Sequence, residues 1–271
     1  LRGGDRCGRR DPQAPGQHQG QCGQQPATRP TRSVFRSRAH GRALTVNHQV
    51  MATMVMALRV VVPPHPLIGH WLGVLRDRHT PGSLYASATA ELGRWLTYEA
   101  VRDWLPHRRI QLESPLAAAE ADVVDPAVPL LALPLLTAGL GLWQGGQTVL
   151  PSAQVIHLQE SLGVITPPAG PIPPRCGVLL FLAELGDGES LLQLLDDLSA
   201  LGVTGDRLRV ITSLASGPGL KAVGERHGSL TIYAAGIDPD LNEAGAIVPG
   251  IGDVGQRLFG GTVLDEMPTD T

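Results

Sequence analysis

The sequence predicts an α/β fold in which a mainly parallel sheet is flanked by helices. Apolar runs of strand length alternate along the chain with segments whose apolar residues recur at helical spacing. One run, VPLLALPLL (128–136), is apolar throughout, as parallel strands buried on both faces are. The chain has 271 residues, of which 42% are hydrophobic, so one large domain with a substantial core is expected.

The expected strands share short lengths, β-branched or apolar residues, and Pro, Gly or charged residues at their ends. In chain order they are LRVVVPP (58–64), RRIQLES (108–114), VPLLALPLL (128–136), the first part of 178–198, RLRVITSLA (207–215) and LTIYAAGI (230–237). The expected helices lie within 84–105, 138–150, the second part of 178–198, and 216–228. The first of these helices is predicted from the spacing of Leu92, Trp95, Leu96 and Val101.

The amino-terminal part of the chain has a different composition. Residues 1–55 are rich in Arg, Gln, Gly and Pro, and residues 1–50 hold nine arginines against Asp5 and Asp11. Such a segment has no periodicity that could build a core. We expect residues 1–55 to be a disordered extension foreign to the native protein; a basic tail that binds nucleic acid and a transit peptide are the alternatives. After this extension we expect one folded domain over residues 56–262 and a carboxyl-terminal tail over residues 263–271.

Charge and cysteine content limit the class of protein. A net charge of −3 gives no reason to expect the core to bind nucleic acid or a membrane. The uncharged stretch 126–143 is cut by prolines and glycines into pieces too short to span a bilayer. Cys7, Cys22 and Cys176 are too few and too scattered for a disulfide framework or a zinc site, so the reducing cytoplasm is the expected compartment.

A glycine-rich loop near the carboxyl terminus is the first candidate for a binding site. The segment 235–261 is too long and irregular for a hairpin, and from Asn242 onward its glycines are Gly245, Gly250, Gly252, Gly255, Gly260 and Gly261. Glycines at this density suggest that the backbone approaches a ligand closely or adopts positive φ. An ordinary surface loop is the alternative.

Three separated motifs resemble the uracil phosphoribosyltransferase family, in consistent order over residues 58–262. They are IDPDLNEAGAIVPGIGDVGQRLFGG (237–261), HPLIGHWLGVLRDRHT (65–80) with ELGRWLTYEAVRDW (91–104), and LLTAGLG (135–141). The resemblance implies a type I-like phosphoribosyltransferase sheet. It also implies that the glycine-rich loop holds the uracil base through main-chain groups, at Ile247, Gly252, Asp253 and Val254. Asp253 would in addition face the ribosyl donor, through its metal or water shell, as the catalytic residue.

The donor loop of this family departs from its pattern here. An aspartate that ends a strand is followed in the family by Pro, two residues and Ala-Thr-Gly-Gly-Ser, and it grips the ribose. The aligned residues here are Leu182, Gly186, Asp187, Gly188, Glu189 and Ser190. Leu182 replaces the aspartate, Asp187 the threonine and Glu189 a glycine, so carboxylates stand where a phosphate should bind. Acids at a helix start are equally typical of simple capping.

Two arginines that the family directs at the pyrophosphate are also replaced. Thr137 stands in LLTAGLG where the family has arginine, and the position of the mobile-loop arginine falls at Glu160 or Ser161. Arg175, beyond a Pro-rich segment, is an alternative cation that the spacing does not require. The sequence therefore predicts a kept base site and a degenerate donor site.

The resemblance implies pyrimidine salvage: phosphoribosyl pyrophosphate and uracil give UMP and pyrophosphate, with Mg²⁺ on the donor and no protein side chain assured as its ligand. Family members are homodimers or larger, and a weakly active enzyme is the first hypothesis. The second is a non-catalytic homologue that binds a pyrimidine or a partner protein. A structural subunit of an active paralogue is a third.

Overall fold

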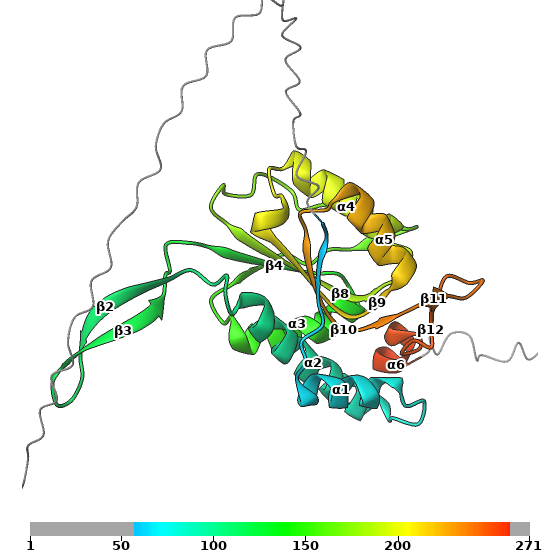
Figure 1. The fold of residues 1–271 in the computed structure, drawn as a ribbon, viewed down its shortest axis with the longest axis horizontal. Helices are drawn as coiled ribbons and strands as arrows, with labels where there is room; N and C mark the ends of the chain where they lie inside the picture. The colour runs from blue at the N-terminus through cyan, green and yellow to red at the C-terminus, as the bar shows by residue number, and fades with distance from the viewer. Residues whose placement is uncertain (1–56, 261–271) are drawn as a thin grey trace, which may run out of the picture. The chain divides into compact units, whose positions relative to one another are not determined.

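The structure, a computed structural model, describes residues 57–260, so the predictions for 1–55 and 263–271, with Cys7 and Cys22, lie outside the described residues. The described part belongs to one compact unit, Ala52–Thr271. Its centre is a six-stranded sheet in which every neighbouring pair is parallel (Figure 1). The strand order is β1 (Arg59–Val61), β10 (Thr231–Asp238), β9 (Leu208–Ser216), β8 (Gly177–Leu185), β4 (Leu130–Pro134) and β5 (Gln154–Val155). The predicted α/β class and its parallel sheet are confirmed.

Helices cover both faces of the sheet (Figure 1). One face carries α1 (Pro66–Arg76), α2 (Gly82–Val101), α3 (Ala138–Val149) and α6 (Val254–Phe259), and the other carries α4 (Glu189–Ala200) and α5 (Gly217–Arg226). Each layer encloses its own apolar core. β4 is buried at every position, as its unbroken apolar sequence predicts. None of the helices within 57–260 has the length and hydropathy to cross a membrane.

Helix α1 was not predicted, although its start carries recognisable signals. His65 has extended backbone angles, its ring nitrogen accepts a hydrogen bond from the amide of Leu67, and Pro66 occupies the first helical position. The helix buries Ile68, Leu72 and Leu75, which lie on one face at helical spacing. Arg76, its last residue, projects toward the carboxyl ends of the strands.

Within residues 57–260, three two-stranded antiparallel pairs lie outside the main sheet. The predicted strand at 108–114 is β2 (His107–Glu113), which pairs with β3 (Ala118–Val124) in a hairpin that extends away from the sheet (Figure 1). A smaller hairpin joins β6 (Glu160–Ser161) to β7 (Val164–Ile165). The third pair, β11 (Asp240–Leu241) with β12 (Ile247–Val248), lies inside the segment 235–261. The expectation that this segment contains no hairpin is therefore wrong.

Helices α2 and α3 approach closely because glycines face each other's backbone. A Cβ on Gly145 would lie 1.6 Å from the carbonyl oxygen of Ala90, and one on Gly93 would lie 2.0 Å from that of Leu142. No side chain fits between the two helices at these points, so their separation fixes where the start of α3 lies.

The order of the strands places a site at the carboxyl end of the sheet. From β4 the chain continues outward to β5, whereas from β8 it runs the opposite way through β9 to β10. The adjacent strands β4 and β8 therefore flank the point at which the direction of winding changes. Ligands of open α/β sheets bind at such a point, beyond the carboxyl ends of the strands.

Replacement of Gly145 by alanine should destabilise the domain by about 2 kcal/mol, because an added methyl group forces α2 and α3 apart. The matched control is Gly69→Ala in α1, where an added Cβ meets nothing within 4 Å. That control should be neutral or stabilising by up to about 1 kcal/mol, since alanine favours a helix. Urea unfolding of the two variants checks the difference, and equal stabilities would contradict the close approach.

Candidate functional site

A cavity of about 470 Å³ opens at the carboxyl ends of β4 and β8. Three segments far apart in sequence form its wall, and a single residue of the β6–β7 hairpin completes it. These segments are 135–139 after β4, 183–184 at the end of β8, and 246–247 with 252–255 in the glycine-rich loop, and the added residue is Glu160. A second hollow of about 120 Å³ shares Leu135, Glu160 and Glu184 with the first. The two hollows together can take a ligand of two parts.

The residues predicted to hold uracil all line the larger cavity: Ile247, Gly252, Asp253 and Val254. Ile247 and Val254 are buried, whereas Gly252 and Asp253 are exposed. One carboxylate oxygen of Asp253 accepts a hydrogen bond from the amide of Gln256 at 2.9 Å and so caps α6. Main-chain groups and apolar side chains thus border this part of the cavity, as recognition of a flat heterocycle requires.

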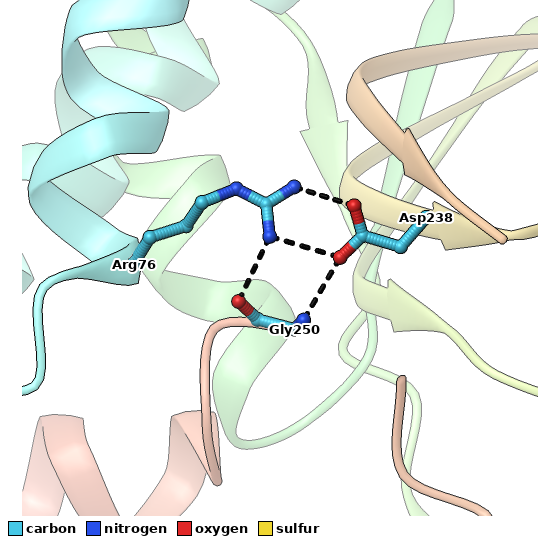
Figure 2. A network of polar contacts seen from close by, with 3 residues as sticks. All are labelled: Arg76, Asp238 and Gly250. Carbon is cyan, nitrogen blue, oxygen red and sulfur yellow. Dashed lines mark hydrogen bonds and ion pairs between the residues drawn. The ribbon is translucent and has the colours of Figure 1, made fainter. Parts of the chain in front are cut away.

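The glycine-rich loop is tied to the sheet and to α1 by a network of Arg76, Asp238 and Gly250 (Figure 2). Both terminal nitrogens of Arg76 donate to the carboxylate of Asp238, at 2.6 and 2.9 Å. Gly250 uses both of its main-chain groups: its carbonyl accepts from Arg76 at 3.0 Å, and its amide donates to Asp238 at 2.8 Å. The hydrogen bonds from Arg76 hold the pKa of Asp238 below its usual value, and those to Asp238 raise the pKa of Arg76.

Gly250 cannot be replaced by another residue without disturbing this network. Its φ is +69°, and a Cβ would lie 2.2 Å from the carbonyl oxygen of Ile247. The density of glycines in the sequence gave the signal for such a backbone, but the partners Arg76 and Asp238 were not identified from it.

Arg257 fixes the other side of the loop. Its guanidinium lies 4.2 Å from the ring centre of Tyr85 and donates to the carbonyls of Leu75, Ile251 and Asp77, the last two at 3.0 and 2.6 Å. These contacts join α6 to α1 and α2. Arg76 and Arg257 therefore both donate hydrogen bonds to the backbone of the loop, and neither lines the cavity.

The predicted donor loop surrounds the second hollow. Leu182, Gly186, Asp187, Gly188 and Ser190 line it; the lining residues do not include Glu189. A carboxylate oxygen of Asp187 accepts a hydrogen bond from the amide of Glu189 at 3.0 Å, which forms an Asx turn across Gly188, the N-cap of α4. Leu182 is only 3% exposed and belongs to the apolar core under α4 and α5. The family pattern directs the amides of this loop at a phosphate. Here the amide of Glu189 is already bound to the carboxylate of Asp187.

The β6–β7 hairpin contacts the same loop. The hydroxyl of Ser190 lies 2.9 Å from a carboxylate oxygen of Glu160 and 3.0 Å from the carbonyl of Gly163. Of the two positions predicted for the mobile-loop arginine, Glu160 and Ser161, the first holds the hairpin against the start of α4. Thr137 lies in the wall of the larger cavity, at the start of α3. Arg175 precedes β8 and lines a separate hollow with Trp104, at the opposite end of the sheet.

Carboxylates are the charged groups on the walls of both hollows among the described residues. They are Glu160, Glu184, Asp187 and Asp253, and no Arg, Lys or His of the described chain lines either hollow. Such a wall repels a polyanion and favours a neutral ligand. Residues 57–260 contain no group of three His, Cys, Asp or Glu side chains that could hold a metal ion, so these carboxylates do not form a metal site by themselves.

Glu184 is the site residue that sequence reasoning missed. It is the next-to-last residue of β8, lies in the wall of both hollows and is partly buried. Burial, with the nearby charges of Asp253 and Asp238, raises the pKa of its carboxyl to about 7. A single acid at the end of an otherwise apolar strand was the available signal, because the carboxyl end of a parallel strand faces the site.

The chain is similar to known proteins over the whole described region. Residues 62–261 match a protein-family model described as uracil phosphoribosyltransferase. A uracil phosphoribosyltransferase of Synechococcus elongatus is 44% identical over 220 residues, covering 76% of this chain and 99% of the relative. A relative from Arabidopsis thaliana, named as the chloroplastic uracil phosphoribosyltransferase, is 38% identical over 209 residues, covering 74% of this chain and 71% of the relative. Among solved structures, the AQ2163 protein from Aquifex aeolicus superposes with a TM-score of 0.66 at 26% identity, covering 75% of this chain and 99% of that chain.

Replacement of Asp238 by asparagine should lower the free energy of unfolding at pH 7 by about 2 kcal/mol. A fully buried pair that loses one partner costs about 3–5 kcal/mol, and the side chain of Arg76 remains 30% exposed. The lowered pKa of Asp238 means that its stabilisation is present above the ordinary value of 3.8 and is lost as the pH falls through the folded pKa. Urea unfolding should therefore show the difference between variant and wild type at pH 7 and a smaller one at pH 3. The exposed Asp240→Asn serves as control and should change neither value.

Proposed function

Because the chain belongs to the uracil phosphoribosyltransferase family, we propose that it transfers the 5-phosphoribosyl group of phosphoribosyl pyrophosphate to N1 of uracil. The products are UMP and pyrophosphate, and the pathway role is pyrimidine salvage. The observation that carries this proposal is the cavity between β4 and β8, whose wall contains all four residues expected to hold the base.

Uracil binds, in this proposal, against the glycine-rich loop. Main-chain groups from Ile247 to Val254 meet its carbonyl and N–H edges, and the apolar side chains of these two residues border its ring. The Arg76–Asp238–Gly250 network keeps this backbone in place before the ligand arrives, so little ordering is needed on binding.

The donor lies across both hollows, with its 5-phosphate at the start of α4 and its reactive carbon beside the base. The bond from N1 of uracil to C1′ forms while the bond from C1′ to the pyrophosphate oxygen breaks. Amides of the loop Gly186–Ser190 and the amino terminus of α4 favour the phosphate. Asp253 faces the donor with the carboxylate oxygen that the amide of Gln256 does not engage.

Weak donor binding is part of the proposal. The carboxylates of Glu160, Asp187 and Glu184 lie in the wall that the donor must meet, and Thr137 offers no charge to the pyrophosphate. Removal of one preorganised charge-stabilising contact reduces rates by about 10²–10³-fold in other enzymes. Mg²⁺ enters as the counter-ion of the donor's pyrophosphate, which reduces the repulsion, with no protein ligand assigned.

A non-catalytic homologue is the second candidate function, and the acidic wall of the donor hollow favours it. In that case the cavity binds a pyrimidine without turnover, or the chain binds a partner protein or an active paralogue as a structural subunit. Assembly as a homodimer or larger and a cytoplasmic location complete the proposal, with residues 1–55 as an extension to the enzymatic domain. The proposed assembly rests on membership of the family, and the proposed location and extension rest on the composition of the chain.

The full-length chain, incubated with uracil, phosphoribosyl pyrophosphate and Mg²⁺, should form UMP, detected by chromatography. Omission of the donor should abolish the product. Uracil alone should raise the melting temperature, since a ligand that binds only the folded state stabilises it. No UMP at high protein concentration, together with a uracil-dependent rise in melting temperature, would favour the non-catalytic homologue; the absence of both would reject a pyrimidine site.

The double substitution Thr137→Arg and Asp187→Thr should tighten binding of phosphoribosyl pyrophosphate by about tenfold or more, which corresponds to about 1.4 kcal/mol. It adds a cation in the wall of the larger cavity and removes a carboxylate from the donor hollow, and it leaves the buried Leu182 untouched. Glu225→Arg on the exposed surface of α5 makes the same change in net charge away from the cavity and should leave the donor Kd unchanged. An unaltered Kd in calorimetry of the double variant would show that this loop does not hold the donor.

A further inference from the structure

Glu184 lies where the two hollows of the site meet. The residue ends a strand beside the switch point and borders both hollows, so it lies between the proposed base site and the proposed donor site. The other wall of the larger cavity is the loop segment that contains Gly252, Asp253 and Val254. A group between the two sites is the one placed to act on the bond that joins them.

The carboxyl of Glu184 differs from the other two carboxyls in the larger cavity. Asp253 caps α6 through one oxygen and is exposed, and Glu160 is exposed and bound to the hydroxyl of Ser190. Glu184 is partly buried, and its carboxyl group has no side-chain hydrogen bond or ion pair with any residue in the range 57–260. Its oxygens therefore remain available to a ligand.

Charged and titratable groups surround Glu184 from several elements. The carboxylate of Asp253 belongs to the start of α6, that of Asp238 to the end of β10, and that of Glu160 to the β6–β7 hairpin. Burial raises the pKa of Tyr85 on α2; the guanidinium of Arg257 opposes this rise, and the charges of Glu184 and Asp253 add to it. Burial and the excess of negative charge place the pKa of Glu184 at about 7, near the pH at which a general base is most effective.

The proposed reaction leaves one proton without an assigned acceptor. Uracil carries hydrogen on N1, and UMP carries the sugar there, so the N1–H bond must break as the N1–C1′ bond forms. The departing pyrophosphate takes the electron pair of the C1′–O bond. The proton from N1 needs an acceptor at the base-facing side of C1′, in a cavity that has an ionisable group at that point.

We propose that Glu184 is this acceptor: its carboxylate takes the proton from N1 of uracil and later releases it to solvent. The assignment rests on the proposed function and names a catalytic residue for it. Before the reaction, the ionised carboxylate accepts a hydrogen bond from N1–H and so orients the base. The acidic wall that weakens donor binding thus contains the group that activates the acceptor.

Replacement of Glu184 by glutamine keeps the shape and removes the base. The rate of UMP formation at saturating substrates should fall about 10²–10⁴-fold, and the pH dependence of kcat/KM for uracil, rising through about pH 7 in wild type, should flatten. Glu184→Asp should restore at least tenfold of the loss, because a carboxylate returns, although further from the base. The exposed Glu225→Gln is the matched change of charge and should behave as wild type. A glutamine variant with wild-type rate, or one that keeps the inflection, would overturn the proposal.

A binding measurement judges Glu184 even when no UMP forms. Uracil should bind wild type about tenfold more tightly at pH 8 than at pH 6, since only the ionised carboxylate accepts the N1 hydrogen. In Glu184→Gln the Kd should be the same at both values. Absence of UMP with this pattern intact would reject the proposed reaction and retain the contact between Glu184 and N1. A Kd for wild type that is independent of pH would overturn the proposal whatever the activity. Melting curves of both substitutions establish that they are folded, and the aspartate variant carries the test if glutamine is not.

Discussion

The site depends on the ion pair between Arg76 and Asp238, which closes around the backbone of Gly250. Three parts of the chain meet there: the end of α1, the end of β10 and the glycine-rich loop. A loop with so many glycines has large conformational freedom when it is unfolded, so its order must come from contacts elsewhere. The network supplies these contacts: both carboxylate oxygens of Asp238 and both main-chain groups of Gly250 form hydrogen bonds in it. The wall that we propose holds the base is therefore fixed to α1 and β10 before a ligand binds.

The donor side of the cavity is built on a different principle. Its polar groups bind one another: Asp187 takes the amide of Glu189, and Glu160 takes the hydroxyl of Ser190. A donor phosphate must compete with these internal partners as well as with the negative charge around them. In our proposal, family membership and the base site support catalysis, whereas these carboxylates limit how strongly the donor is held.

Much of the fold was predictable because its signals are local. Apolar runs gave β4, β8, β9 and β10, and helical spacing gave α2. His65 and Pro66 are typical of a helix start, yet α1 was not predicted from them. The β11–β12 pair was not predicted because two-residue strands are too short to show a periodic pattern. The four residues that the family motifs predict to hold the base all line one cavity. Arg76 and Glu184 could not be assigned from sequence in the same way, since their roles arise from neighbours 162 residues away in one case and from burial at a strand end in the other.

The pairing of β1 with β10 has a consequence for how the protein is made. β1 is the first strand of the domain and β10 is the last strand of the sheet, and they lie side by side in parallel. During synthesis β1 has no partner until residues 231–233, with which it pairs, have left the ribosome. Contacts this distant along the chain slow folding, because the intervening loop must be ordered first. Until then both edges of β1, which is an edge strand of the folded sheet, lack hydrogen-bonding partners, and unpaired strand edges make an incompletely folded chain prone to aggregate.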